Sequence, residues 1–298
     1  MNYISIHTQI VQITMKITYS ISNWIYGEEP LEAQFIRLQK YGYDAIEIMV
    51  TDPDEFDLEQ VKKYIEKYAL PCSSICTMVS WVPDKDTRRN LIDKDSKIRK
   101  RTIDYLKGCL RIGNELDAKL TLFVPSGVAN TTDTWTPENK EMCVSAMQEL
   151  GDHARSLGSI LAVIEPINRY ENIFLRRCDQ AIELLKEANH PQVKLMLDFF
   201  HTNIEEDNNG DAIRLAGNNL VHCHIADSNR KSTGRGQTDW FEIYRALRDI
   251  DFNGALACEP LPPTGANVFE SLEGTRPEAD LYAKECISYL KYIESVIK

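Results

Sequence analysis

The segment ILAVIEPINRYE, residues 160–171, runs from a short apolar stretch directly into a carboxylate, Glu165, and then a proline. Short apolar runs bounded by turn-forming residues are typical of strands that are buried on both faces. An acid at the end of such a strand is costly to bury unless it has a partner or a task. The segment therefore predicts a buried strand with a chemically active carboxyl end.

Seven other runs have the same character, and stretches of helical period lie between them. These runs are residues 16–22, 45–50, 73–78, 119–124, 193–199, 220–227 and 255–260. Eight strands that are each followed by a helix predict an α/β fold, a closed (β/α)8 TIM barrel. The alternative is an open doubly wound sheet, but no glycine-rich dinucleotide loop follows the first strand.

The domain organisation follows from the same pattern, because no linker interrupts it. A single TIM-barrel domain over residues 1–298 is expected. Residues 1–14 are interpreted as a possible N-terminal extension, since a convincing strand begins directly after Met15. They lack the basic start, the unbroken apolar stretch and the small-residue cleavage site of a secretory signal.

Composition excludes several classes of partner. The net charge is −11, from 45 acidic and 34 basic residues, so the chain is expected to repel nucleic acid and anionic membranes. No run of about 18 apolar residues predicts a membrane span. The eight cysteines form no CxxC pair, which favours a cytoplasmic protein with reduced thiols.

Four consecutive strands in the second half end on residues that can bind a metal. They are Glu165, Asp198, His224 and Glu259. The carboxyl ends of barrel strands meet on one face, where the reacting groups of TIM barrels lie. A lone carboxylate at a strand end is more often a helix cap, but four at equivalent places predict a site. Three carboxylates and one imidazole suit Mn²⁺, Mg²⁺ or Co²⁺ better than a closed zinc site.

Each of three strand ends carries a further polar residue on the adjoining loop. Glu171 follows Glu165, while His201 and Arg230 follow the next two strands. These three side chains are predicted to bind a small polar substrate. His222 lies two residues before His224 and points the same way, so it is interpreted as a core or supporting histidine. The GxG of STGRGQTDW is interpreted as a turn.

These motifs resemble a known family. From KITYSISNW to the last helix, the chain is similar to the xylose-isomerase-like barrels and, within them, to the ketose 3-epimerases of the D-tagatose/D-psicose 3-epimerase group. The most specific segments are IEPINRYE, LDFFHTNIEE, HCHIADSNRKSTGRGQTDW and CEPLPPTGANV. The loops that follow the third and fourth strands differ from the family pattern, which leaves the identity of the sugar open.

The resemblance implies a metal-dependent epimerase that inverts C3 of a ketose through an enediolate. It implies that Glu165, Asp198, His224 and Glu259 bind a divalent metal, usually Mn²⁺, and that the two glutamates form the acid/base pair. It also implies that Glu171, His201 and Arg230 contact the first carbons and oxygens of the sugar. A homo-oligomer, dimer or tetramer, is expected.

Other functions are compatible with the same ligands. An aldose–ketose isomerase, an inosose isomerase or dehydratase, or a hydroxypyruvate isomerase would use a similar metal site. A DNA-repair endonuclease of the same superfamily would need more metal ligands and a basic groove. The chain has six histidines and a charge of −11, and both numbers argue against that function. A non-catalytic sugar-binding barrel is disfavoured because no member of the ligand set is missing.

Overall fold

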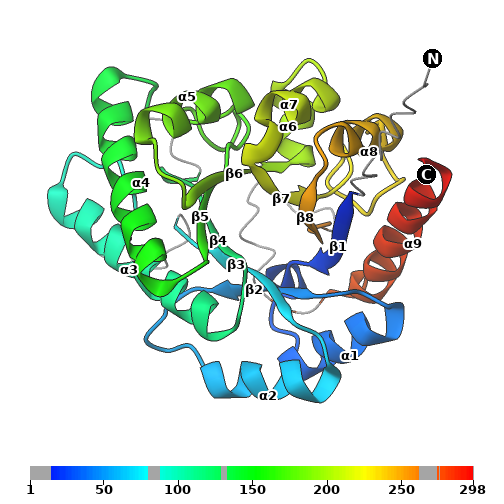
Figure 1. Ribbon diagram of the computed structural model, residues 1–298. Coiled ribbons are helices and arrows are strands. Elements are labelled where there is room, and N and C mark those ends of the chain that lie inside the picture. The colour runs from blue at the N-terminus through cyan, green and yellow to red at the C-terminus, as the bar shows by residue number, and fades with distance from the viewer. Residues whose placement is uncertain (1–14, 80–87, 129–132, 262–273, 275, 298) are drawn as a thin grey trace, which may run out of the picture.

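The computed structural model describes residues 15–79, 88–128, 133–261, 274 and 276–297. In this part of the chain, eight parallel strands form one sheet (Figure 1). The strand order is β1-β8-β7-β6-β5-β4-β3-β2, and a parallel bridge between Ser22 and Glu47 joins the ends of β1 and β2. The strands are β1 (Lys16–Ile21), β2 (Ile46–Val50), β3 (Cys72–Thr77), β4 (Leu120–Phe123), β5 (Leu161–Ile164), β6 (Val193–Asp198), β7 (Leu220–Ile225) and β8 (Asn253–Cys258). The sheet is a nearly closed barrel, which confirms the predicted TIM-barrel fold.

Helices surround the barrel on its outside (Figure 1). They are α1 (Leu31–Tyr41), α2 (Leu58–Tyr68), α3 (Ser96–Glu115), α4 (Pro137–Leu157), α5 (Cys178–Ala188), α6 (Phe199–Glu205), α7 (Asn209–Ala216), α8 (Trp240–Asp249) and α9 (Ala279–Ile297), with short 3-10 turns η1 (Asn23–Tyr26) and η3 (Gly217–Asn219). Side-chain caps fix several of their starts. Asp57 accepts from the Gln60 N–H at α2, and Asp239 accepts from the Glu242 N–H at α8.

One local prediction was wrong. His201 was expected on a loop, but it lies inside the short helix α6, which begins directly after β6. The N-cap of this helix is Asp198, whose Oδ1 accepts from the Phe200 N–H at 2.8 Å. An acid at the end of a strand can therefore start the next helix and hold that helix against the barrel mouth.

The core fills the barrel and the layer between its strands and helices, and it includes all eight cysteines as buried, unpaired thiols. Burial raises the pKa of several of these thiols, Cys72 among them, to about 12, so they pack as small apolar groups. Among the described helices, none is long and apolar enough to cross a membrane. The expected extension at residues 1–14 lies outside the described residues.

Candidate active site

The four predicted metal ligands lie at the carboxyl ends of β5 to β8. Asp198 is the last residue of β6 and is paired in register with His224 of β7. Glu165 and Glu259 come directly after β5 and β8, and their N–H groups donate to Phe123 and Ile225 of the neighbouring strands. All four ligands are buried. The barrel therefore brings four distant segments of sequence together at the carboxyl end of its strands.

Two of the acids approach His224 Nδ1. Glu259 Oε1 is 3.4 Å from this nitrogen and Glu165 Oε1 is 3.9 Å from it. Ligand atoms of Glu165, Asp198 and His224 all lie within 4.8 Å of one another. Spacings of this size leave room for one cation between the groups, since metal–oxygen bonds to such ions are about 2.0–2.6 Å long.

Asp198 provides a test of whether a metal fits. One of its carboxylate oxygens caps α6, whereas the other, Oδ2, is buried and accepts no hydrogen bond; His201 Nε2 lies 3.4 Å from Oδ2 without the geometry of a hydrogen bond. An unpartnered buried carboxylate oxygen is costly, and a cation would supply the missing partner. With its hard oxygen donors and single imidazole, this cluster fits a divalent ion.

The electrostatics of the cluster lead to the same conclusion. Burial raises the pKa of Glu165 well above its usual range and that of Glu259 to about 7, with Asp198 adding repulsion to both. Burial alone would lower the pKa of His224, but Glu259 and Glu47 outweigh it and raise that pKa well above its usual range. Three acids this close repel one another unless positive charge lies between them.

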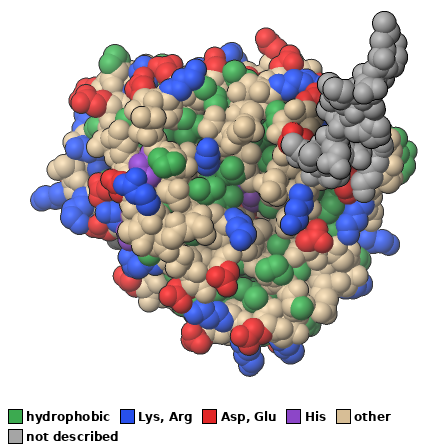
Figure 2. Space-filling view, in the orientation of Figure 1, with side chains coloured by type: hydrophobic (Ala, Val, Ile, Leu, Met, Phe, Trp, Pro, Cys, Tyr) green, Lys and Arg blue, Asp and Glu red, His purple; other side chains and the backbone are tan. Residues whose placement is uncertain are grey.

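A cavity opens above the cluster. The space, about 600 Å³ with the open solvent at its mouth included, is lined by Trp24, Cys76, Thr77, Met78, Val79, Leu122, Val124, Val128, Glu165, Ile167, Glu171, His201, His224, Arg230 and Glu259. Part of this lining is apolar, and its charged and imidazole side chains, Glu171, His201 and Arg230 among them, are called its polar wall. On the face of the molecule shown in Figure 2, acidic and basic side chains are interspersed. A small polar ligand fits this cavity.

The three predicted substrate-binding residues also line this cavity, and Asn168 links two of them. Its Nδ2 lies 3.0 Å from Glu171 Oε1 and 2.6 Å from His201 Nδ1. The Asn168 Oδ1 accepts from the Tyr170 N–H, so Nδ2 is the donor to both. His201 Nδ1 is thus an acceptor, and Nε2 of the same ring, 3.4 Å from Asp198 Oδ2, carries the proton.

Arg230 closes the polar wall. Its Nη1 donates to Glu171 Oε1 at 3.0 Å, and its Nη2 lies 3.9 Å from Glu259 Oε2. The guanidinium carbon is 4.6 Å from the centre of the Phe200 ring, a cation–π contact. Burial alone would raise the pKa of Glu171, but His201 and Arg230 outweigh it and lower that pKa. Glu171 is therefore held as a carboxylate beside the cavity.

The loop that carries Arg230 is built around Asp227, which is fully buried. This carboxylate accepts from the N–H groups of Ser228, Gly234 and Thr238 and from the indole of Trp240. The predicted turn at GxG wraps around the same group. Gly234 has a φ of +86°, and a Cβ at Gly236 would lie 2.2 Å from Asp227 Oδ1. Both glycines are therefore needed for this loop to close on the carboxylate.

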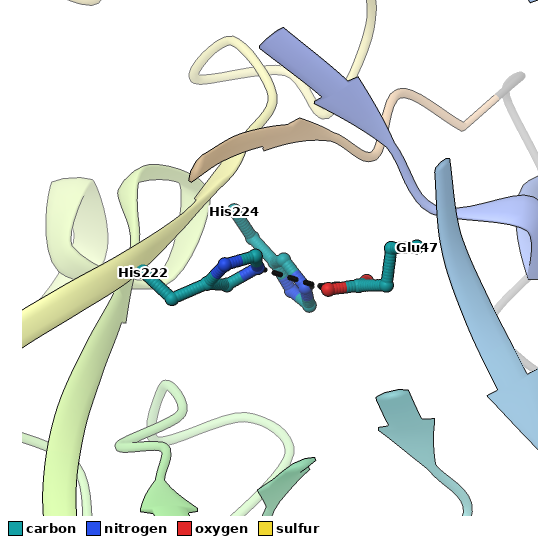
Figure 3. Close-up of side chains that lie close together, drawn as sticks. All are labelled: Glu47, His222 and His224. Atoms are coloured by element: carbon teal, nitrogen blue, oxygen red, sulfur yellow. Dashed lines mark hydrogen bonds and ion pairs between the residues drawn. The ribbon is translucent and has the colours of Figure 1, made fainter. Parts of the chain in front are cut away.

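Two residues of the site, Glu47 and Trp24, were not predicted from the sequence. Glu47 of β2 lies across the barrel from β7, and both His222 and His224 point toward its carboxylate (Figure 3). Trp24 of η1 donates its indole N–H to Glu259 Oε1. His222 is fully buried one layer below His224, at the place expected of a supporting histidine.

Comparisons with known proteins agree with the fold. A family model described as the xylose isomerase-like TIM barrel matches residues 35–286. D-psicose 3-epimerase from Agrobacterium fabrum is 34% identical over 254 residues, which cover 82% of this chain and 85% of that protein. D-psicose 3-epimerase from Ruminiclostridium cellulolyticum is 30% identical over 259 residues, 84% of this chain and 86% of that protein.

A solved structure is also similar. The structure of D-psicose 3-epimerase with D-tagatose from Clostridium cellulolyticum matches with a TM-score of 0.81 and 27% identity, over 94% of this chain and 99% of that one. The resemblance noted in the sequence is thereby confirmed. Because the family model spans most of the sequence and the relatives match over more than four fifths of it, this chain belongs to the xylose isomerase-like TIM barrel family.

Proposed function

We propose that this protein is a metal-dependent epimerase that inverts C3 of a ketose. The observation that carries the proposal is that two buried glutamates, which directly follow β5 and β8, approach His224 Nδ1 to 3.9 and 3.4 Å. Inversion of a carbon beside a ketone needs one group to remove a proton and another to return one on the opposite face. The relatives named as D-psicose 3-epimerases support this assignment.

The metal would be held by Glu165, Asp198, His224 and Glu259, and we propose Mn²⁺, with Co²⁺ or Mg²⁺ as substitutes. A bound divalent ion would stabilise the negative charge that develops on the ketone oxygen. The ion would also lower the raised pKa values of the glutamates, so that one of them can accept a proton.

Glu165 and Glu259 would act as the acid/base pair. One carboxylate takes the proton from C3, and this leaves an enediolate. The other returns a proton to the opposite face, and the roles exchange in the reverse reaction. Trp24 would hold Glu259 in place through its indole N–H, since this bond fixes one carboxylate oxygen and leaves the other free to face the substrate.

The polar wall would orient the C1–C2 end of the sugar. Arg230 supplies positive charge near the developing oxyanion, while His201 presents its protonated Nε2 and Glu171 accepts from sugar hydroxyls. Asn168 would keep these last two side chains in fixed orientations through its hydrogen bonds. We also propose a single domain and a homo-oligomeric assembly.

The deciding experiment uses D₂O. With D-psicose or D-tagatose as substrate, a 3-epimerase of this type should place deuterium at C3 of the product and leave C1 unlabelled. The returned proton differs from the one removed, because each glutamate works on its own face and exchanges with solvent. NMR of the product measures the position of the label.

The rival reaction gives the opposite pattern. Deuterium at C1 with C3 unlabelled would identify an aldose–ketose isomerase and end the epimerase assignment, while the metal site would stand. If the sugars take up no deuterium at any carbon when the protein is loaded with Mn²⁺, this result would contradict both enzymatic assignments.

Arg230→Ala should raise KM and lower kcat together, with a loss of about 10–100-fold in kcat/KM and with metal content unchanged. The size follows from the loss of charge-assisted hydrogen bonds, each worth about 1.5–3 kcal/mol. Steady-state kinetics and the Mn²⁺ content of the purified variant measure the two effects.

Arg230→Lys is the matched control for this prediction. It keeps the positive charge but loses the planar guanidinium that contacts Glu171 and the Phe200 ring, so an intermediate loss is expected. Kinetics of Arg230→Ala equal to those of the wild type would show that this loop does not touch the substrate.

A further inference from the structure

Glu47 is a buried acid that the proposed mechanism does not use. It is the second residue of β2, has no exposed surface and is absent from the cavity wall. Its Oε1 lies 2.9 Å from His224 Nε2. An ionised carboxylate in such a place is retained only when its partners replace the lost hydration. The question is therefore what this group does for the side chains around it.

The carboxylate of Glu47 is held on two sides. His222 Nε2 approaches Oε2 at 2.9 Å, without the alignment of a hydrogen bond. Ser74 Oγ donates to the same oxygen at 2.6 Å, and a chain of hydroxyls continues from Ser74 through Ser73 to Ser20. Both contacts are made to Oε2, which leaves Oε1 to accept from His224.

The two nitrogens of His224 face different groups. Nε2 points to Glu47, whereas Nδ1 points to Glu259 and Glu165, at 3.4 and 3.9 Å (Figure 3 shows the Glu47 side). A neutral imidazole carries one proton, and the nitrogen without the proton is the one that can bind a metal. A proton on Nδ1 would leave the lone pair of Nε2 directed at a carboxylate oxygen. That arrangement is repulsive, so the contact with Glu47 selects the other tautomer.

We propose that Glu47 is a positioning residue for the metal centre: it accepts the Nε2–H of His224 and so leaves Nδ1 free, turned toward Glu165 and Glu259, as the metal-binding nitrogen. The inference rests on the metal site of the proposed function but concerns a residue outside the ligand set. A partner of this kind fixes both the tautomer and the orientation of a ligating histidine, and its loss typically costs about 10–100-fold in metal affinity.

A rival interpretation is a second ion bound by Glu47, His222 and His224, whose ligand atoms lie within 4.8 Å of one another. In that case Nε2 of His224 would be a ligand and could carry no proton. The two interpretations therefore differ in the protonation of one nitrogen and in the number of ions per chain, and both quantities can be measured without assaying catalysis.

The first experiment uses the wild-type protein, so it does not depend on a variant that folds. Protein labelled with ¹⁵N in its histidine rings is loaded with Zn²⁺, a diamagnetic ion that binds imidazole well. Long-range ¹H–¹⁵N spectra should show the His224 proton on Nε2 and a shift of Nδ1 when zinc is added. A His224→Gln sample assigns the ring, and metal analysis should give one ion per chain.

The second experiment measures Mn²⁺ affinity by the electron paramagnetic resonance signal of the free ion. Glu47→Gln should weaken Mn²⁺ binding about 10–100-fold, because the side chain loses its charge and can present its NH₂ group to Nε2. Ser74→Ala is the matched control, since it removes a donor to the same carboxylate but leaves the charge. Its affinity should stay within about threefold of the wild type, and circular dichroism checks the fold of each variant.

The outcomes separate this inference from the proposed function. A proton on Nδ1 in the zinc-loaded protein, two ions per chain, or unchanged Mn²⁺ affinity in folded Glu47→Gln would overturn the role of Glu47 and leave the epimerase proposal intact. A wild-type protein that binds no divalent ion would overturn both. A proton on Nε2 of His224, one ion per chain and weaker Mn²⁺ binding in Glu47→Gln, observed together, would establish the role of Glu47.

Discussion

Glu165→Gln and Glu259→Gln should each lower kcat by about 10²–10⁴-fold, the loss typical of a missing general acid or base. An amide has nearly the shape of a carboxylate but cannot take up or deliver the proton. Each glutamate is also a proposed metal ligand. Mn²⁺ content must therefore be measured beside the rate, and kcat compared at saturating metal.

Solvent exchange gives these variants a sharper signature than a slow rate. If one acid remains, it can still remove the proton from one epimer and return it to the same face. Each variant should then exchange deuterium into C3 of a single epimer without converting it, and the two variants should act on opposite epimers. Two variants that exchange the same epimer would mean that the glutamates do not work from opposite faces.

The fold was predictable because its signals are local. Short apolar runs and the helical stretches between them gave eight strands whose ends lie within about two residues of those in the structure. The main discrepancy is β8, which was predicted at residues 255–260 but spans Asn253–Cys258. Helix α6 was missed because it is only seven residues long and rich in aromatic residues, so it has no clear helical period.

The ligand set was predictable because barrel topology turns a repeated position in the sequence into proximity in space. Asp198 and His224 are far apart in the chain but sit side by side, since Asp198 ends β6 and is paired in register with the next-to-last residue of β7. Residues with no such positional rule were missed. Glu47 is one polar residue in the run AIEIMV, and nothing near it in sequence indicates that His224, 177 residues away, is its partner.

The metal ligands at the ends of β5 to β8 could thus be predicted from the positions of the strand ends. The supporting contacts could not, because they depend on how the elements pack. Asn168 reaches His201 only because α6 is held against the mouth of the barrel by its cap at Asp198. Asp227 could have been noticed as another acid just past a strand, but its role depends on a loop that curls back to present three N–H groups to it. Local sequence does not encode that curl.

Removal of metal should abolish activity, and Mn²⁺ or Co²⁺ should restore it best. Without an ion, the carboxyl pKa values raised by burial and mutual repulsion leave the cluster partly protonated, and nothing stabilises charge on the ketone oxygen. Protein dialysed against a chelator is assayed before and after addition of each ion. Zinc should bind but restore activity poorly, because its tetrahedral preference leaves too little room for two substrate oxygens.

The same ions should stabilise the fold, which separates binding from catalysis. An ion that binds only the native state at 100 times its Kd adds about 2.7 kcal/mol to the free energy of unfolding, so Tm should rise by several degrees. Zinc should raise Tm while failing to restore kcat, whereas Mn²⁺ should do both. Asp198→Asn serves as the control, because it keeps a cap for α6 but removes the charge of the unpartnered oxygen, and its Tm should respond little to any ion. Full activity in protein shown to be free of metal would rule the mechanism out, since the two glutamates alone leave the developing oxyanion with only Arg230 to balance it.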